Sequence, residues 1–156
     1  FKAWEMYGAG DPSVVVAVMD MGIQYDHPDL VANMWVNEGE LNGEPNKDND
    51  GNGIKNDIYG YNGLTRDGNI EPGSHGTHVA GTVAATNNNG IGVSGVAGGT
   101  GVGDGARLMS CQIFSGGKSA ADAATARAVK YAADNGTTLR RATTRTCTVM
   151  PPTTVR

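Results

Sequence analysis

Two residues far apart in the chain, Asp20 and His75, carry side chains that together could act as a general base. Asp20 directly follows the apolar run at 14–19, and His75 opens the helix-like segment 74–86. A general base of this type needs an imidazole held by a carboxylate at Nδ1, which leaves Nε2 free to take a proton from a nucleophile. We therefore predict an acid–base pair at Asp20 and His75 if the two lie close together in the fold. An aspartate that only caps a turn is the alternative for Asp20 taken alone.

The elements that must position this pair are predicted from hydrophobic patterns and small residues. Apolar runs at 14–19 and 106–114 indicate fully buried strands of the kind found in parallel sheets, and segments 74–86 and 119–136 indicate helices. Alternating strands and helices predict an α/β fold, with a doubly wound, mostly parallel sheet and helices on both faces. In such sheets active sites gather beyond the carboxyl ends of the strands, where Asp20 is expected.

A second histidine, His78, raises the question of a metal site. His75 and His78 are three residues apart, so they would share one face of a helix and could ligate zinc. The metalloprotease helix has its histidines four apart with a glutamate beside the first, and here Gly76 occupies the position of that glutamate. The spacing therefore favours a packed, hydrogen-bonded role for His78 over a zinc site.

Two longer motifs surround the acid–base pair: VVVAVMDMGIQYDHPDL and, further along, SHGTHVAGTVAATNNNGIGVSGVAG. The chain from about Val14 to Gly136 resembles the subtilase family of serine proteases in these motifs. The resemblance implies a subtilisin-like fold and serine-type endopeptidase activity, with Asp20 and His75 as two members of a triad whose serine comes last. Met21 stands where the family usually has serine or threonine, but the carboxylate that orients the histidine is present.

The later motifs of the family are an apolar strand with a Ser-x-Gly edge, an oxyanion asparagine and a Gly-Thr-Ser nucleophile segment, and this sequence contains none of them. Ser110, Ser115 and Ser119 stand in different contexts. Without a nucleophile and oxyanion donors, most of the stabilisation of the transition state is missing. We therefore expect a truncated catalytic domain, incomplete at both ends, that hydrolyses no peptide bonds by itself.

The polar excursion at 37–63 is too long for an ordinary loop and contains the features of a cation site. Oxygen donors alternate in its centre, with a glycine for the sharp turn and a later carboxylate: Asp48, Asp50, Asn52 and Asp57. Tyr59 stands where an EF-hand would have its glutamate, so the loop is not an EF-hand. Clustered oxygen donors repel one another without a cation, which favours calcium over a loop that simply turns.

A second calcium site follows from the resemblance alone. The family's tight site uses the aspartate of His-Pro-Asp-Leu, here Asp29, together with the loop 86–93 after the histidine helix. Asn88 or Asn89 would supply a side-chain oxygen in that loop. The loop is one residue longer than the shorter family versions, and we name Asn88 as the ligand.

The composition narrows the possible partners. Residues 1–136 hold all sixteen acidic residues and no basic patch, which argues against nucleic acid. No apolar run approaches the roughly 20 residues of a membrane helix. We expect protein or peptide substrates, a monomer, and an extracellular location whose export signal is not visible here. The two cysteines, Cys111 and Cys147, are too few to define a disulfide framework.

The last twenty residues differ from the rest. We divide the chain into a partial peptidase domain at 1–136 and a Thr/Arg-rich tail at 137–156 that lacks helical or strand periodicity. A reading-frame shift and a natural disordered tail are both compatible with this composition. The rival to the protease hypothesis is a calcium-binding or pseudo-protease module that binds peptides and needs no serine.

Overall fold

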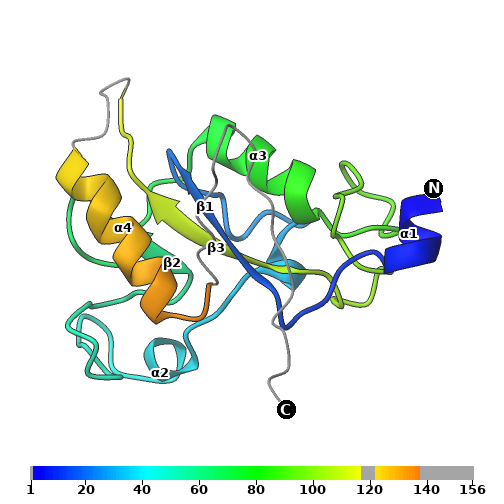
Figure 1. The fold of residues 1–156 in the computed structure, drawn as a ribbon. Coiled ribbons are helices and arrows are strands. Elements are labelled where there is room, and N and C mark those ends of the chain that lie inside the picture. The colour runs from blue at the N-terminus through cyan, green and yellow to red at the C-terminus, as the bar shows by residue number, and fades with distance from the viewer. Residues whose placement is uncertain (1, 117–121, 138–156) are drawn as a thin grey trace, which may run out of the picture.

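A computed structural model describes residues 2–116 and 122–137 and contains a three-stranded parallel sheet of order β1-β3-β2 (Figure 1). The elements in chain order are α1 (Lys2–Tyr7), β1 (Val15–Asp20), a 3-10 turn (Val31–Asn33), α2 (Glu38–Leu41), β2 (Gly60–Asn62), α3 (Ser74–Ala84), β3 (Arg107–Gln112) and α4 (Asp122–Asp134). The doubly wound α/β fold is confirmed. The Thr/Arg-rich tail from 138 onward, with Cys147, lies outside the described residues, as does the start of the predicted helix at 119–121.

The alternation of side chains along the strands gives each face of the sheet its own core. Val18 and Leu108 pack in one hydrophobic cluster with alanines of α3, whereas Met109 and Cys111 pack in another with Ala128 and further residues of α4. The two helices therefore cover opposite faces of the sheet, as Figure 1 also shows. Within the described residues, no helix is both long and apolar enough to cross a bilayer.

The two predicted strands differ in burial. β3 is central, and every residue of it after Arg107 is buried. The prediction of full burial is wrong for β1, in which only Val18 and Asp20 are buried. β1 lies at the edge of the described sheet and pairs with β3 on one side only, so solvent reaches its outer side. Burial in β3 raises the pKa of Cys111 to about 12, which makes this thiol a core group rather than a reactive one.

The polar excursion contains a strand that the sequence pattern did not predict. β2 consists of only three residues and pairs in parallel with β3. Gly60 has φ +138°, and a Cβ at this position would lie 2.0 Å from the carbonyl oxygen of Ser110. The close approach of the two backbones therefore requires glycine at position 60. Because β2 is formed by backbone hydrogen bonds over only three residues, the sequence shows no hydrophobic pattern that would predict it.

The two long helices follow their predicted segments, with shorter bounds. α3 presents Gly76, Ala80 and Ala84 among its buried residues, and such small side chains let a helix lie close to the sheet. α4 ends at Asp134; Gly136, two residues later, has φ +96°, and the N–H of Thr137 donates to the carbonyl of Ala132 at 3.0 Å. This glycine-dependent ending is the one that the sequence predicts.

Candidate active site

The carboxylate of Asp20 is held at the carboxyl end of β1. Asp20 is the last residue of that strand and is only 8% exposed. Its Oδ1 accepts a hydrogen bond of 2.7 Å from the backbone N–H of Met21, and its carbonyl oxygen accepts one of 2.8 Å from the N–H of Ile113. The side chain that replaces the family's serine or threonine at position 21 does not take part in this contact, because the backbone supplies the donor.

The imidazole of His75 reaches this carboxylate from the first turn of α3. Its Nδ1 lies 2.9 Å from Oδ1 and 2.8 Å from Oδ2 of Asp20. Because an ionised carboxylate only accepts hydrogen bonds, this contact favours the neutral tautomer with the proton on Nδ1, in which Nε2 keeps its lone pair. The side chain of His75 is 70% exposed, so Nε2 is accessible from outside. The structure thus brings together the two residues that the sequence analysis paired.

Glycines allow the strand end and the helix start to approach one another. Gly22 has φ +95°, and a Cβ there would lie 2.2 Å from the carbonyl oxygen of Glu71. A Cβ at Gly76 would lie 2.3 Å from the carbonyl oxygen of Gly22. A side chain at either position would therefore force apart the segments that carry Asp20 and His75.

A buried glutamine joins the segments around the pair. Gln112, at the end of β3, is 1% exposed, and its Oε1 accepts hydrogen bonds from the N–H of Glu71 at 2.8 Å and from Nδ2 of Asn62 at 3.1 Å. Its Nε2 donates to the carbonyl oxygen of Phe114 at 3.1 Å. Gln112 therefore links β2, β3 and the segment that leads into α3. Sequence reasoning missed it, although a polar residue inside the apolar run 106–114 was a visible signal.

A groove runs along one face of α3, and neither Asp20 nor His75 is among its lining residues. Its volume is about 630 Å³, and it is lined on the helix by Ser74, Thr77, His78, Gly81 and Thr82. These positions follow helical spacing and mark one face of α3. His78 is exposed on this face, and no group of potential metal ligands in the described part of the chain includes it or His75. The geometry thus pairs His75 with a carboxylate rather than with His78.

Two of the serines that the sequence analysis considered, Ser110 and Ser115, are engaged in hydrogen bonds away from His75. Ser110 is buried, and its Oγ accepts a hydrogen bond of 3.0 Å from the N–H of Ile23. Ser115 donates to Oε2 of Glu71 at 3.1 Å. Between 2 and 116 and between 122 and 137, no serine hydroxyl is hydrogen-bonded to His75, and Ser119 lies outside these ranges.

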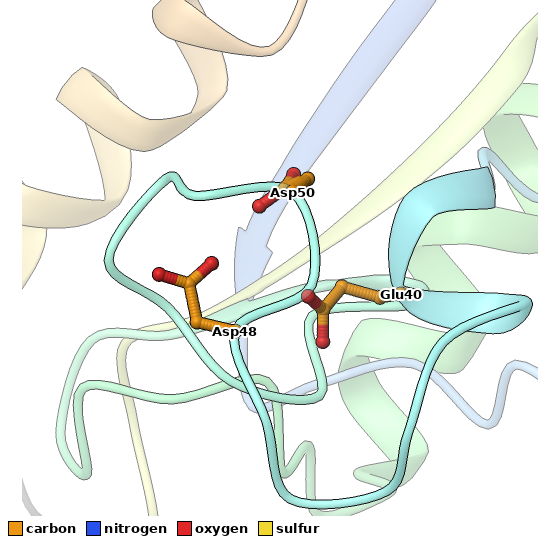
Figure 2. A group of neighbouring side chains, drawn as sticks. All are labelled: Glu40, Asp48 and Asp50. Carbon is orange, nitrogen blue, oxygen red and sulfur yellow. The ribbon is translucent and has the colours of Figure 1, made fainter.

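The polar excursion gathers three carboxylates that could hold a metal ion. Glu40, Asp48 and Asp50 each offer an oxygen, and these atoms lie within 4.8 Å of one another (Figure 2). Asp48 and Asp50 come from the predicted loop, whereas Glu40 comes from α2 and was missed. Glu40 is 5% exposed and accepts from the N–H of Asn49 and from the N–H of Asn56, so it also closes the loop.

The other two predicted ligands, Asn52 and Asp57, lie beside this cluster. Nδ2 of Asn52 donates to Oδ2 of Asp50 at 3.0 Å and to Oδ2 of Asp57 at 2.9 Å. Asp57 is fully buried, and its Oδ1 has no hydrogen-bond partner. Burial raises the pKa of Asp57, and the hydrogen bond from Tyr131 opposes this shift only in part.

The sequence of residues 11–139 matches the model of the Subtilase family. This match covers most of the chain, including Asp20 and His75. The chain belongs to the subtilase family.

Three curated relatives show how far the similarity extends. Subtilisin-like protease 1 of Plasmodium berghei is 49% identical over 82 residues, which cover 52% of this chain and 14% of the relative. Halolysin of Haloferax mediterranei is 35% identical over 139 residues, 86% of this chain and 21% of that protein. The halolysin-like extracellular serine protease Nep of Natrialba magadii shows the same identity and coverage. The subtilase chain thus spans about a fifth or less of the length of these relatives.

The loop after α3 in this subtilase brings a different asparagine to Asp29 from the one named as a calcium ligand. Nδ2 of Asn89, not of Asn88, donates to Oδ1 of Asp29, at 2.8 Å. Asn88 has φ +59° and donates to the carbonyl oxygen of Thr100 at 3.2 Å. Oδ2 of Asp29 accepts from the N–H of Val93 at 2.9 Å, and Asp29 is 2% exposed.

Proposed function

We propose that this chain supplies the general base, His75, and its orienting carboxylate, Asp20, to a serine-type endopeptidase. The observation that carries the proposal is the contact of Nδ1 of His75 with both carboxylate oxygens of Asp20, with the ring otherwise exposed. Membership of the subtilase family supports the reaction class. The substrates are proteins or peptides, because the acyl-transfer chemistry of such a pair acts on their amide bonds.

The proposed mechanism begins with proton transfer. Nε2 of His75 accepts the proton of a serine hydroxyl as its oxygen attacks the carbonyl carbon of the peptide bond. Asp20 holds the ring in the required tautomer and stabilises the imidazolium that forms. His75 then delivers the proton to the leaving amine, and a water molecule is activated in the same way to release the acyl group. The hydrogen bond from the N–H of Met21 helps to hold the carboxylate of Asp20 in place during these steps.

These 156 residues provide no serine in a Gly-Thr-Ser context, so we propose that hydrolysis needs further residues. The purified 156-residue chain is expected to remain unlabelled by a fluorophosphonate probe, which reacts only with an activated serine. The measurement is intact-mass spectrometry after incubation with the probe, with an active subtilase as the positive control. Stoichiometric labelling of the chain would contradict the proposed absence of a nucleophile.

The coding DNA downstream of Gly136 separates the protease proposal from the rival binding module. A frame that encodes an apolar strand with Ser-x-Gly and, later, Gly-Thr-Ser supports a peptidase domain at 1–136, with 137–156 as a separate, non-matching segment. A clean frame without these motifs supports a calcium-binding, pseudo-protease module. The cluster of Glu40, Asp48 and Asp50 is the observation that favours this second candidate.

Calcium is the proposed cofactor under either reading. Carboxylates and carbonyls are the hard oxygen ligands that Ca²⁺ prefers, and the loop concentrates them around Glu40, Asp48 and Asp50. The buried, unpartnered Oδ1 of Asp57 fits a neighbouring positive charge, because a buried anionic oxygen without a partner is costly. Asn52, which donates to both Asp50 and Asp57, would belong to the same site. Asp29, with Asn89, would hold a second ion. Bound calcium would order loops whose entropy opposes folding.

The cellular setting is proposed from the family and its relatives. One relative carries the word extracellular in its name, and we propose the same location for this chain. We propose that the chain acts as a monomer on protein or peptide substrates, without nucleic acid or membrane partners. The excess of acidic over basic residues is consistent with the absence of a nucleic-acid partner.

A further inference from the structure

The carboxylate of Asp57 is buried with only neutral hydrogen-bond donors around it. Its Oδ2 accepts from the hydroxyl of Tyr131 at 2.6 Å, from Nδ2 of Asn52 at 2.9 Å and from Nδ2 of Asn37 at 3.4 Å. No ion pair of the described residues includes Asp57. One oxygen is thus saturated with donors, whereas Oδ1 has none although the residue is 0% exposed.

The same two asparagines connect Asp57 to the acidic cluster. Nδ2 of Asn37 donates to Oδ2 of Asp50 at 2.9 Å, and Nδ2 of Asn52 donates to the same oxygen at 3.0 Å. Each amide group therefore bridges a carboxylate of the cluster and the buried carboxylate. Asp57 therefore belongs, through Oδ2, to the same polar network as Asp50, while its Oδ1 has no partner in that network.

The donor of the shortest of these hydrogen bonds comes from a distant element. Tyr131 lies on α4, 74 residues after Asp57, and is 6% exposed. Its ring stacks on Tyr61 with centroids 5.0 Å apart and meets Trp35 edge to face at 6.5 Å. These contacts fix the ring, so the hydroxyl can hold Asp57 in only one orientation.

We propose that Tyr131 is a positioning residue for the calcium loop: its hydroxyl holds the carboxylate of Asp57, whose Oδ2 shares the amide donors of Asn37 and Asn52 with the cluster residue Asp50. This inference rests on the proposed calcium binding of the loop. Outer partners of this kind orient metal ligands, and their loss commonly weakens metal affinity 10- to 100-fold. Because Tyr131 belongs to α4, ion binding in the loop is thereby coupled to the packing of α4 on the sheet.

The substitution Tyr131→Phe tests the proposal, because it removes the hydroxyl and retains the ring contacts. In calcium titrations of the full chain by isothermal calorimetry, the dissociation constant of the loop site is expected to rise about tenfold. The site of Asp29 is expected to keep its affinity. Tyr61→Phe is the matched control, since it removes a hydroxyl from the stacked neighbouring ring, and it should leave both affinities unchanged. An unchanged dissociation constant of the loop site in Tyr131→Phe would overturn the proposal.

Asp48→Asn separates a failure of this inference from a failure of calcium binding itself. If the wild-type chain shows no calcium binding that is lost in Asp48→Asn, the proposed loop site is wrong. The proposed role of Tyr131 is then wrong as well. If Asp48→Asn abolishes a site that Tyr131→Phe leaves unaltered, only the role of Tyr131 is wrong. If Tyr131→Phe does not fold, the near-ultraviolet tyrosine spectrum of the wild-type chain tests the coupling between calcium binding and Tyr131 instead. Calcium must change that spectrum, and Asp48→Asn must remove the change; a spectrum insensitive to bound calcium refutes the coupling.

Discussion

Replacing Asp20 with asparagine is expected to lower kcat for peptide hydrolysis about ten-thousand-fold in a form of the protein that also carries the catalytic serine. Asparagine keeps the shape of the side chain, but its amide N–H can donate to Nδ1 of His75. This contact would stabilise the tautomer with the proton on Nε2, which cannot accept the proton of serine. The expected loss corresponds to about 5 kcal/mol of transition-state stabilisation. Hydrolysis of a peptide substrate under saturating conditions measures it.

Asp26→Asn is the control for this prediction. Asp26 is exposed, six residues after Asp20, so the variant removes the same charge from the same region of the chain without touching His75. Its kcat should stay close to that of the wild type. A fall of tenfold or less in Asp20→Asn would show that Asp20 does not select the tautomer of His75.

Removing calcium is expected to destabilise the chain substantially. A site held at a hundred times its dissociation constant contributes about 2.7 kcal/mol to the free energy of unfolding. For a domain of this size, the loss of one such site should lower the melting temperature by roughly 5–10 °C. Thermal unfolding followed by circular dichroism, before and after addition of a calcium chelator, measures the change.

Single substitutions in the loop show which residues are responsible for the fall in melting temperature. Asp48→Asn should reproduce in calcium-containing buffer the share of the loss that belongs to the cluster in Figure 2, because Asp48 is one of its carboxylates. Glu44→Gln is the matched control: Glu44 is an exposed acid of the same excursion that pairs with Lys47 and lies outside the cluster. Equal melting temperatures with and without chelator would contradict calcium binding by this chain.

The central pairing could be predicted from the sequence because local signals determine it. The apolar run before Asp20 requires a strand, and the small residues after His75 require a helix that lies close to the sheet. Parallel strands place their carboxyl ends at one edge, so the end of β1 and the start of α3 were expected at the same rim. The structure places Nδ1 of His75 2.8 Å from Oδ2 of Asp20 at this rim.

The residues that sequence reasoning missed are defined by contacts between distant segments. β2 exists because Gly60 permits close pairing with β3, and nothing in its composition resembles a strand. Glu40 joins the carboxylate cluster only because α2 folds back over the loop. Asn89 rather than Asn88 contacts Asp29, and which of two neighbouring asparagines does so depends on the backbone geometry of the loop.

The tautomer of His75 is the most direct test of the account. Nuclear magnetic resonance of the chain labelled with ¹⁵N-histidine, at a pH where the imidazole is neutral, identifies the protonated ring nitrogen. We predict a proton on Nδ1, with a resonance far downfield that disappears in Asp20→Asn, and an unprotonated Nε2. A proton on Nε2, or an Nδ1–H signal that Asp20→Asn leaves unchanged, would contradict the proposal that this aspartate prepares His75 to act as a base.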